Sequence, residues 1–225
     1  MSVQADFDRL ALVSDDGATH NDFYHNFLLR HLPSCRESAL EIGCGAGTFS
    51  RRLAAHFDQV LALDISPEMI RLARERSAEF PNIEYKLADV LDYDLPAESF
   101  DCIATSATLH HLPYREMLVK MKAALKPDGV LLILDLFEPA GLFESGGLTD
   151  TVLNFIAFPV SVALRVKHYG RLRRSKEARA AWATHEAHDL YPTMTEVRAL
   201  CAELLPGAKI RKHLLWRYSI VWQKD

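Results

Sequence analysis

A glycine-rich segment, residues 39–47, has the composition of a ligand-binding turn. It reads Ala-Leu-Glu-Ile-Gly-Cys-Gly-Ala-Gly, so a short apolar strand runs into three alternate glycines, Gly43, Gly45 and Gly47. Glycine leaves no Cβ between the backbone and a ligand, and the helix that follows offers unpaired N–H groups at its N-terminus. Ligands of open α/β sheets bind at this end of the strands. The segment therefore predicts a turn that binds a cofactor.

The spacing of the glycines argues against the common phosphate-binding turns. A dinucleotide fingerprint needs GxGxxG, but Thr48 and Ser50 occupy the third glycine position in the two readings of this segment. The GxxxxGK[ST] phosphate loop is absent as well. An acid, Glu41, precedes the first glycine, and a carboxylate would repel a pyrophosphate but accepts hydrogen bonds from an ammonium group. S-adenosylmethionine has an ammonium group and no phosphate, so it fits the turn better than a dinucleotide does.

Two further acids follow apolar strands. Asp64 ends the second expected strand, and Asp89 follows the third. A carboxylate at the C-terminal end of a strand can accept hydrogen bonds from both hydroxyls of a ribose. We therefore expect Asp64 to bind the cofactor rather than to cap a helix. Asp89 lies in an acidic loop that could simply be solvated.

These motifs resemble those of class I, Rossmann-like S-adenosylmethionine methyltransferases, over residues 37–137 and the last two strands. The fourth motif, residues 100–111, and the turn at residues 125–129 match as well. The resemblance implies S-adenosylmethionine as cofactor and S-adenosylhomocysteine as product. It implies that the turn cradles the methionine part, that Asp64 binds the ribose and that Asp89 contacts the adenine. The full set of cofactor-binding residues that it implies is Glu41, Gly43, Cys44, Gly45, Gly47, Asp64, Ile65, Met69, Asp89, Val90 and Ser106.

Strands and helices alternate along the part of the chain that carries these motifs. Five apolar strands are expected, at residues 39–42, 60–63, 83–87, 100–105 and 130–136. Helices are expected between them, at residues 48–57, 67–77 and 117–125, with a turn at residues 126–129. This alternation predicts a parallel sheet covered on both faces. A helix at residues 195–205 and apolar segments at residues 209–216 and 218–223 predict an antiparallel strand pair at one edge.

The expected fold is therefore a doubly wound α/β domain with a seven-stranded, mostly parallel sheet, an antiparallel C-terminal edge hairpin and a helical lid insertion. By the resemblance, six strands share one direction and one opposes them. We expect one methyltransferase domain, residues 1–225. Its parts are an N-terminal helical cover at 1–36 with a helix at 21–31, a cofactor-binding core at 37–138, a helical lid insertion at 139–192, and a C-terminal helix and strand pair at 193–225.

The insertion breaks the strand–helix rhythm and has two parts of different character. Residues 142–166 are rich in apolar and aromatic side chains, whereas residues 165–179 contain seven Lys or Arg and one Glu. One interpretation is a hydrophobic lid over an apolar acceptor, with cations that pair with an anionic group on it. Another is a helix that touches a membrane and collects a lipid-like acceptor. A third is an amphipathic helix with a solvated basic face, or a dimer contact.

Three histidines are candidates for catalysis: His111, His110 and His185. Methyl transfer from a sulfonium is an in-line displacement that depends mostly on positioning, but a phenol or carboxylic acid acceptor also needs a base. His111 is the candidate base, because it follows the fourth strand and could face the transferred methyl group. His185 and His188 share one face of an expected helix and could line the acceptor cavity. The alternative is that these rings pack against the cofactor or lie on the surface. No metal site is expected, because His185-Glu-Ala-His188 is one residue short of HExxH.

The region after the fourth strand narrows the range of possible methyl acceptors. It lacks the [DNS]PP[YF] run of enzymes that methylate DNA bases or glutamine, and it has no acid between Asp101 and Glu116 of the kind that arginine and catechol methyltransferases use. Residues 109–113 resemble those of enzymes that act on small metabolites. We expect methylation of a small, partly apolar metabolite, with oxygen favoured over nitrogen, carbon or sulfur. The alternatives are an NAD(P)-dependent reductase, a non-catalytic S-adenosylmethionine-binding module and, more weakly, an aminopropyl transferase.

The composition of the chain restricts its possible binding partners and cellular compartment. The chain has 225 residues, a net charge of −4 and a pI of about 6.2, which argues against a nucleic-acid-binding protein. The four cysteines form no CxxC pair, as expected for reduced thiols in the cytoplasm. No secretory signal or membrane-spanning run is recognisable. We expect a cytoplasmic monomer or homodimer that binds a small-molecule methyl acceptor and no nucleic acid, without stable membrane insertion; peripheral contact through the lid stays open.

Overall fold

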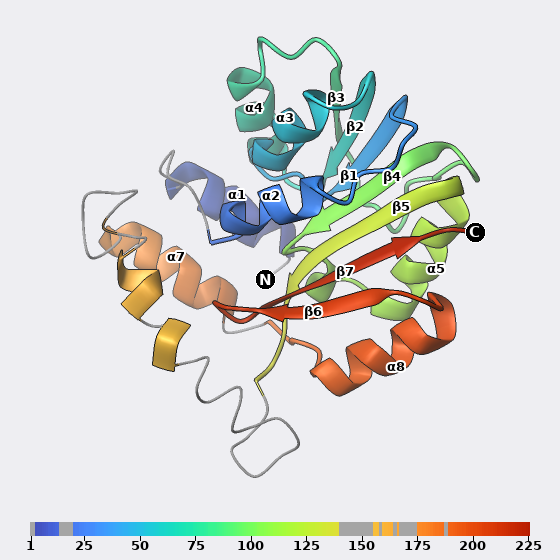
Figure 1. The fold of residues 1–225 in the computed structure, drawn as a ribbon. Helices are drawn as coiled ribbons and strands as arrows, with labels where there is room; N and C mark the ends of the chain where they lie inside the picture. The colour runs from blue at the N-terminus through green and yellow to red at the C-terminus, as the bar shows by residue number, and fades with distance from the viewer. Residues whose placement is uncertain are drawn as a thin grey trace.

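The fold is a seven-stranded sheet between two layers of helices (Figure 1). The computed structural model describes residues 3–13, 20–139, 155–157, 159–163, 166, 175–186 and 189–225. The strands are β1 (Ser38–Ile42), β2 (Gln59–Asp64), β3 (Ile83–Leu87), β4 (Phe100–Ser106), β5 (Leu125–Leu136), β6 (Lys209–His213) and β7 (Arg217–Gln223). Their order across the sheet is β3-β2-β1-β4-β5-β7-β6.

The directions of the strands confirm the predicted fold class. Strands β1 to β5 pair in parallel, and β7 is antiparallel to both β5 and β6. Six strands therefore share one direction and β7 opposes them. The last two strands form the predicted antiparallel hairpin, with β6 at the edge.

Each face of the sheet is covered by its own set of helices. Leu40, Ile42 and Ile103 lie in one core cluster with Met117 and Leu118. These last two residues belong to α5 (Tyr114–Ala124), which covers that face together with α8 (Met194–Leu204). The opposite face is covered by α2 (Asp22–Leu29), α3 (Thr48–Ala54) and α4 (Pro67–Arg76). Successive residues of β1 thus pack on opposite layers, as a strand buried on both faces requires.

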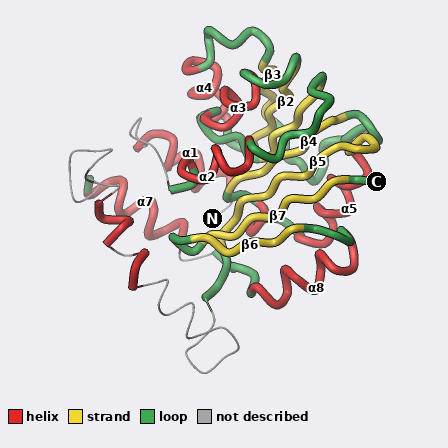
Figure 2. Tube along the Cα trace, in the orientation of Figure 1, coloured by secondary structure: helices red, strands yellow, loops and turns green. Residues whose placement is uncertain are grey.

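Three elements lie beyond the carboxyl ends of the parallel strands. They are α1 (Val3–Val13), the 3₁₀ turn η1 (Leu109–His111) and α7 (Lys176–Glu186). Figures 1 and 2 show α1 and α7 side by side at this end of the sheet, and the two helices are in contact. This is the end at which open α/β sheets bind their ligands.

Local capping fixes where α4 and α8 begin. Ser66 follows β2 closely, and its Oγ accepts a hydrogen bond from the N–H of Met69 at 3.1 Å. Pro67, in the first turn, has no N–H to leave unsatisfied. Thr193 and Glu196 form a reciprocal capping box at the start of α8. The cap of α4 matters for the site because it fixes the chain just after Asp64.

Two details differ from the sequence-based expectation. The turn predicted at residues 126–129 lies inside β5, because Asp128 N–H donates to Lys224 O at 3.0 Å and Lys224 N–H donates to Gly129 O at 2.9 Å, which keeps the segment attached beside β7. The strand predicted to reach residue 216 ends at His213 as β6. Leu215 and Trp216 then turn the chain in left-handed conformations with no glycine to signal it.

The predicted lid insertion falls largely outside the described residues. Of residues 139–192, the structure describes a few helical residues at 155–157, 159–163 and 166, together with α7 and its flanks. Most of the apolar and basic stretches, and His188, lie outside that part. The division into cover, core, lid and C-terminal unit stays a prediction. Among the described residues, no helix is long and apolar enough to cross a membrane.

Candidate active site

The glycine turn between β1 and α3 has the predicted shape. Gly43, Gly45 and Gly47 all have positive φ, at +73°, +51° and +76°. A Cβ at Gly43 would lie 2.1 Å from Thr108 Oγ1, and one at Gly47 would lie 2.4 Å from the Tyr85 hydroxyl. A Cβ at Gly45 would meet no described residue within 4 Å. The outer glycines are therefore required by the protein's own packing, whereas the middle one faces open space that a ligand can use.

Asp64 joins the glycine turn to the start of α4. Its Oδ2 accepts a hydrogen bond from Gly45 N–H at 2.7 Å, and its Oδ1 accepts one from Ser66 N–H at 2.9 Å. Burial raises the pKa of this carboxyl, and the backbone N–H groups oppose that shift. The backbone N–H of Ile65 also bonds to this carboxyl, and a carboxylate with about four acceptor positions still has one left for a ligand. Asp64 is thus held at the strand end where the sequence places a ribose-binding acid.

Glu41 lies beneath the turn and is almost fully buried. Its carboxyl accepts a hydrogen bond from the Ser50 hydroxyl of α3. Burial raises the pKa of Glu41 to about 8, so the carboxyl keeps its proton at neutral pH in the absence of a nearby cation. The neighbouring Cys44 is buried too. The predicted contact between Glu41 and an ammonium group stays a prediction.

The loop after β3 holds Asp89 and Val90. Asp89 Oδ1 accepts the N–H of Leu91 at 2.9 Å, so the acid caps its own loop with one oxygen. The Lys120 ammonium of α5 donates to the carbonyls of Val90 and Leu91 at 2.7 and 2.9 Å. Val90 is buried and Asp89 is half-buried. The start of the loop, Asp89 to Leu91, is therefore bound to α5, whereas Asp92 and Asp94 are exposed, and the contact of Asp89 with adenine stays a prediction.

Ser106 ends β4 with a polar atom that lacks a partner. Its Oγ is buried and makes no hydrogen bond among the described residues. A buried hydroxyl in this state costs free energy unless a ligand or water satisfies it. The position at the carboxyl end of the sheet therefore favours Ser106 as part of a binding site.

Helix α1 covers the other side of the turn. Leu10 and Ala11 form a buried cluster with Met69, and Phe7 packs against the same cluster beside Ala46 of the turn. Ile65 is half-buried close by in sequence. Ser66 Oγ also donates to Asp8 Oδ1 of α1 at 2.5 Å. Helix α1, which the sequence analysis did not predict individually, thus packs beside the glycine turn and the start of α4, and its role as a cover for the cofactor stays a prediction.

His110 is fixed by an acid that the sequence analysis missed. Its Nδ1 lies 2.6 Å from Asp135 Oδ1, and its backbone N–H donates to Asp135 Oδ2 at 2.9 Å. Asp135 is completely buried near the end of β5. With Nδ1 assigned as the donor to this carboxylate, Nε2 is left as the acceptor. The signal that could have revealed it is an Asp inside the otherwise apolar run 130–136.

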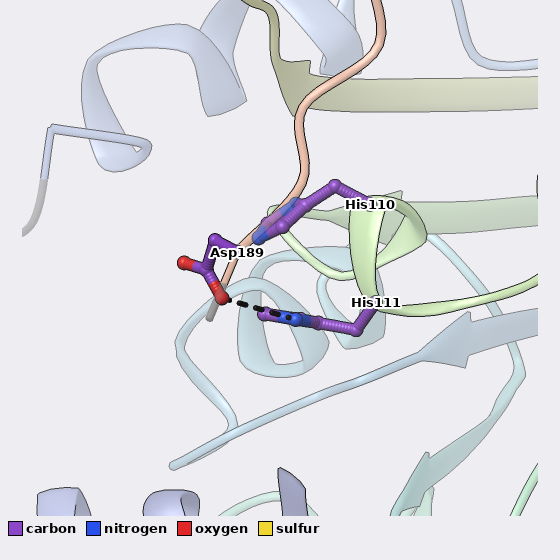
Figure 3. Close-up of side chains that lie close together, drawn as sticks. All are labelled: His110, His111 and Asp189. Carbon is purple, nitrogen blue, oxygen red and sulfur yellow. Dashed lines mark ion pairs between the residues drawn. The ribbon is translucent and has the colours of Figure 1, made fainter. Parts of the chain in front are cut away.

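The three histidines predicted for catalysis lie together. Ring centroids are 3.9 Å apart for His110 and His111, and 5.0 Å apart for His111 and His185. Asp189, a second missed acid, lies between two of them. Its Oδ1 is 3.5 Å from His111 Nδ1 (Figure 3), and its Oδ2 is 3.7 Å from His185 Nε2. Burial and then the adjacent His110 lower the pKa of His111 to about 4. At neutral pH this ring is uncharged.

This histidine cluster adjoins the glycine turn. Thr108, just before η1, has its Oγ1 3.4 Å from the Gly43 carbonyl and donates to it. Phe7 of α1 meets the rings of His111 and His185 edge-on, with centroids 5.4 and 4.9 Å away. The described residues also place ligand atoms of His110, His111 and Asp189 within 4.8 Å of one another. Imidazole and carboxyl side chains thus gather beside the glycine turn, at the carboxyl end of the sheet.

Comparison with known proteins decides the family. Residues 39–129 match the model of the methyltransferase domain. An uncharacterized methyltransferase of Mycobacterium tuberculosis (strain ATCC 25618 / H37Rv) is 31% identical over 207 residues, which cover 90% of this chain and 95% of the relative. The chain belongs to the methyltransferase family. It is a class I, S-adenosylmethionine-dependent enzyme, which decides against the NAD(P)-dependent reductase.

Other members of the methyltransferase family match less of the chain or only its fold. A ubiquinone biosynthesis O-methyltransferase of Xanthomonas campestris pv. campestris (strain B100) is 36% identical over 117 residues, 50% of this chain and 47% of that protein. The N-methyltransferase NodS of Bradyrhizobium japonicum, solved with S-adenosylhomocysteine, aligns with a TM-score of 0.64 at 20% identity and covers 99% of this chain and 98% of that one. At that identity the likeness concerns the fold.

Proposed function

We propose that this methyltransferase transfers a methyl group from S-adenosylmethionine to an oxygen of a small, partly apolar metabolite. The observation that carries the proposal is the cluster of His110, His111 and His185 beside the glycine turn. A general base is needed for a hydroxyl acceptor, whose proton must be removed, and a neutral imidazole is the usual one. The partial similarity to an O-methyltransferase supports oxygen as the atom methylated.

The residues at the turn fit the cofactor. Within the described part of the chain, Gly45 leaves open space and Ser106 Oγ has no partner, and Asp64 holds its carboxyl at the end of β2 with an acceptor position left. When bound, S-adenosylmethionine supplies an electrophilic methyl group on a positively charged sulfur. We assign the ribose to Asp64, the adenine to the Asp89–Val90 loop and the methionine part to the turn.

His110 is the proposed base. Asp135 holds its ring by Nδ1, so Nε2 can accept the proton of the acceptor hydroxyl, and the buried carboxylate then stabilises the imidazolium. As the proton leaves, the acceptor oxygen forms its bond to the methyl carbon and the carbon–sulfur bond breaks. The sulfur keeps that electron pair and S-adenosylhomocysteine results.

Aromatic rings around the histidines favour an acceptor with an apolar body. The ring of Phe7 packs against the rings of His111 and His185. The ring centroids of Trp182 and His185 are 5.8 Å apart, and those of Tyr191 and His110 are 5.0 Å apart. Such rings bind flat or apolar groups, while the imidazoles can hydrogen-bond one polar atom of the acceptor. The cysteines of the described chain are free thiols, which supports a reducing cytoplasm as the compartment.

The test is an acceptor screen with phenols, carboxylic acids, thiols and amines, followed by mass spectrometry of the product. We expect methylation of a hydroxyl oxygen, with turnover reduced by about 10²–10⁴ in His110→Gln. Asp135→Asn should also reduce turnover, and neither substitution should change the affinity for S-adenosylmethionine. His213→Gln, on β6, is the matched control and should keep full turnover. Products methylated only on nitrogen or sulfur, or full activity in His110→Gln, would contradict the proposal.

A further inference from the structure

The side chains of His110, His111 and Asp189 lie close together, but Asp189 is too far from His111 for a hydrogen bond to account for their arrangement. Where a histidine pairs with an acid in this cluster, His110 to Asp135, the atoms are 2.6 Å apart. Asp189 approaches His111 and His185 only to 3.5 and 3.7 Å, which is longer than a hydrogen bond between nitrogen and oxygen. Its Oδ2 accepts a hydrogen bond from the Tyr191 hydroxyl at 2.8 Å instead. The nearly buried Asp189 carboxylate thus stands between two imidazoles and is bonded to neither.

These separations suit ligands of a shared ion. Two atoms bound to one ion at about 2.1 Å each, at a tetrahedral angle, lie about 3.4 Å apart. His111 Nδ1 and Asp189 Oδ1 are 3.5 Å apart. One ligand atom from each of His110, His111 and Asp189 lies within 4.8 Å of the others, so small side-chain rotations bring all three to an ion (Figure 3).

The surroundings of His110 are those of a metal ligand. A ligating histidine almost always donates its other ring N–H to a carboxylate or carbonyl, which fixes the ring and its tautomer. Here Nδ1 is held by the fully buried Asp135, and Nε2 is left for the ion. A second observation comes from His111, whose Nε2 is buried without a partner among the described residues. Within that part of the chain, no hydrogen bond of Nε2 holds the ring against the small rotation that brings Nδ1 to an ion.

We propose that His110, His111 and Asp189 bind one divalent transition-metal ion of the Zn²⁺ or Co²⁺ class. Two imidazoles and one carboxylate suit such ions better than Mg²⁺ or Ca²⁺, which take oxygen ligands. Three protein ligands leave a coordination position open beside the glycine turn. The role of the ion rests on the proposed function, and His110 Nε2 has one role in each state. In the metal-free enzyme it accepts the proton of the acceptor hydroxyl; in the metal-loaded enzyme it ligates the ion, which lowers the pKa of that hydroxyl so that its proton passes to water.

The test measures metal binding without cofactor or acceptor. Chelator-treated protein is titrated with Co²⁺ by visible absorption and with Zn²⁺ by calorimetry, in a Cys35→Ser background. That background disables the second group of potential ligands, Cys35, Glu37 and Asp101. We expect one ion per chain. Asp189→Asn and His111→Gln should each weaken binding at least about tenfold, and Asp135→Asn by about 10–100-fold. His213→Gln should bind as the parent protein does.

Either no binding in the parent or equal binding by all variants would overturn the proposal. X-ray absorption of the Zn²⁺-loaded parent protein keeps the test independent of variants that fail to fold. It should show two imidazoles with zinc–nitrogen distances of about 2.0–2.1 Å, and a first shell without them would count against the site. Since neither measurement involves methyl transfer, a failed metal site leaves the proposed methylation standing. Failed methylation by the metal-loaded enzyme would instead contradict the proposed function.

Discussion

At the scale of single residues, the three glycines of the turn are needed for different reasons. Gly43 and Gly47 are required because the Thr108 and Tyr85 side chains occupy the space of a Cβ, whereas Gly45 faces open space. Gly43→Ala should therefore destabilise the fold by several kcal/mol, since overlap adds to a left-handed strain of about 1–2 kcal/mol. Gly45→Ala should lose only the stability that the left-handed strain costs, but it should weaken S-adenosylmethionine binding at least tenfold. Chemical denaturation and calorimetry on both variants check this, and equal losses of stability would contradict it.

Glu41 gives the free enzyme a pH dependence with a definite sign. Its pKa in the fold is about 8, against 4.5 when exposed, so unfolding releases its proton between these values. This carboxyl therefore stabilises the fold at low pH, and that contribution is lost as the pH rises from about 4.5 to 8. Glu41→Gln should reduce the fall in melting temperature as the pH rises over that range. Glu84→Gln, at an exposed position of β3, is the control and should leave that fall unchanged. Identical profiles for wild type and Glu41→Gln would show that the carboxyl is already ionised.

At the scale of elements, the contact between α2 and α3 contains a buried histidine. His25 stacks on Phe49 with centroids 4.4 Å apart, and neither ring nitrogen has a hydrogen-bond partner among the described residues. Burial, with Arg52 nearby, lowers the pKa of His25 to about 3. The stability that its neutral form provides is therefore present above pH 6.5 and lost as the pH falls towards 3.

His25→Phe should stabilise the protein by about 1 kcal/mol at neutral pH, because it removes two unsatisfied buried nitrogens. The gain should grow at pH 5, where the histidine would have to stay uncharged. Urea denaturation at the two pH values measures both effects. His56→Phe, at an exposed position, is the control and should change stability little. A loss of stability in His25→Phe at both pH values would show that the ring nitrogens do have a partner.

The elements themselves were largely predictable. Apolar strands separated by amphipathic helices gave β1 to β4 nearly at their observed ends, because burial on both faces forces continuous apolar runs. The turn inside β5 and the left-handed Leu215 and Trp216 were not predictable, since tertiary partners rather than turn residues hold them. In the candidate site, the glycines and Asp64 carry a local pattern. Asp135 carries only a weak pattern, an acid inside an apolar strand, and Asp189 carries none. Neither pattern names the histidine partner, because the acids approach the histidines only through the packing of the strands and α7.

At the scale of the whole molecule, α1 closes over the cofactor region from the far end of the sequence. Leu10 is buried against Met69, whereas Leu12 on the same helix is 72% exposed. Leu10→Ala should loosen this cover and raise the dissociation rate of S-adenosylmethionine at least about tenfold, since burying a leucine contributes about 2–5 kcal/mol. Leu12→Ala should leave the rate unchanged. Stopped-flow displacement measures both, and equal rates would remove α1 from the account of cofactor binding.

The most direct test of the central claim is calorimetric titration of the protein with S-adenosylmethionine, S-adenosylhomocysteine and NADH, repeated on Asp64→Asn. Asp92→Ala, in the exposed part of the loop after β3, is the control. The account predicts that both sulfur ligands bind in the range of about 1 µM to 1 mM, that Asp64→Asn weakens both at least tenfold while remaining folded, and that NADH does not bind. Binding of NADH without either sulfur ligand, or undiminished binding by Asp64→Asn, would contradict it.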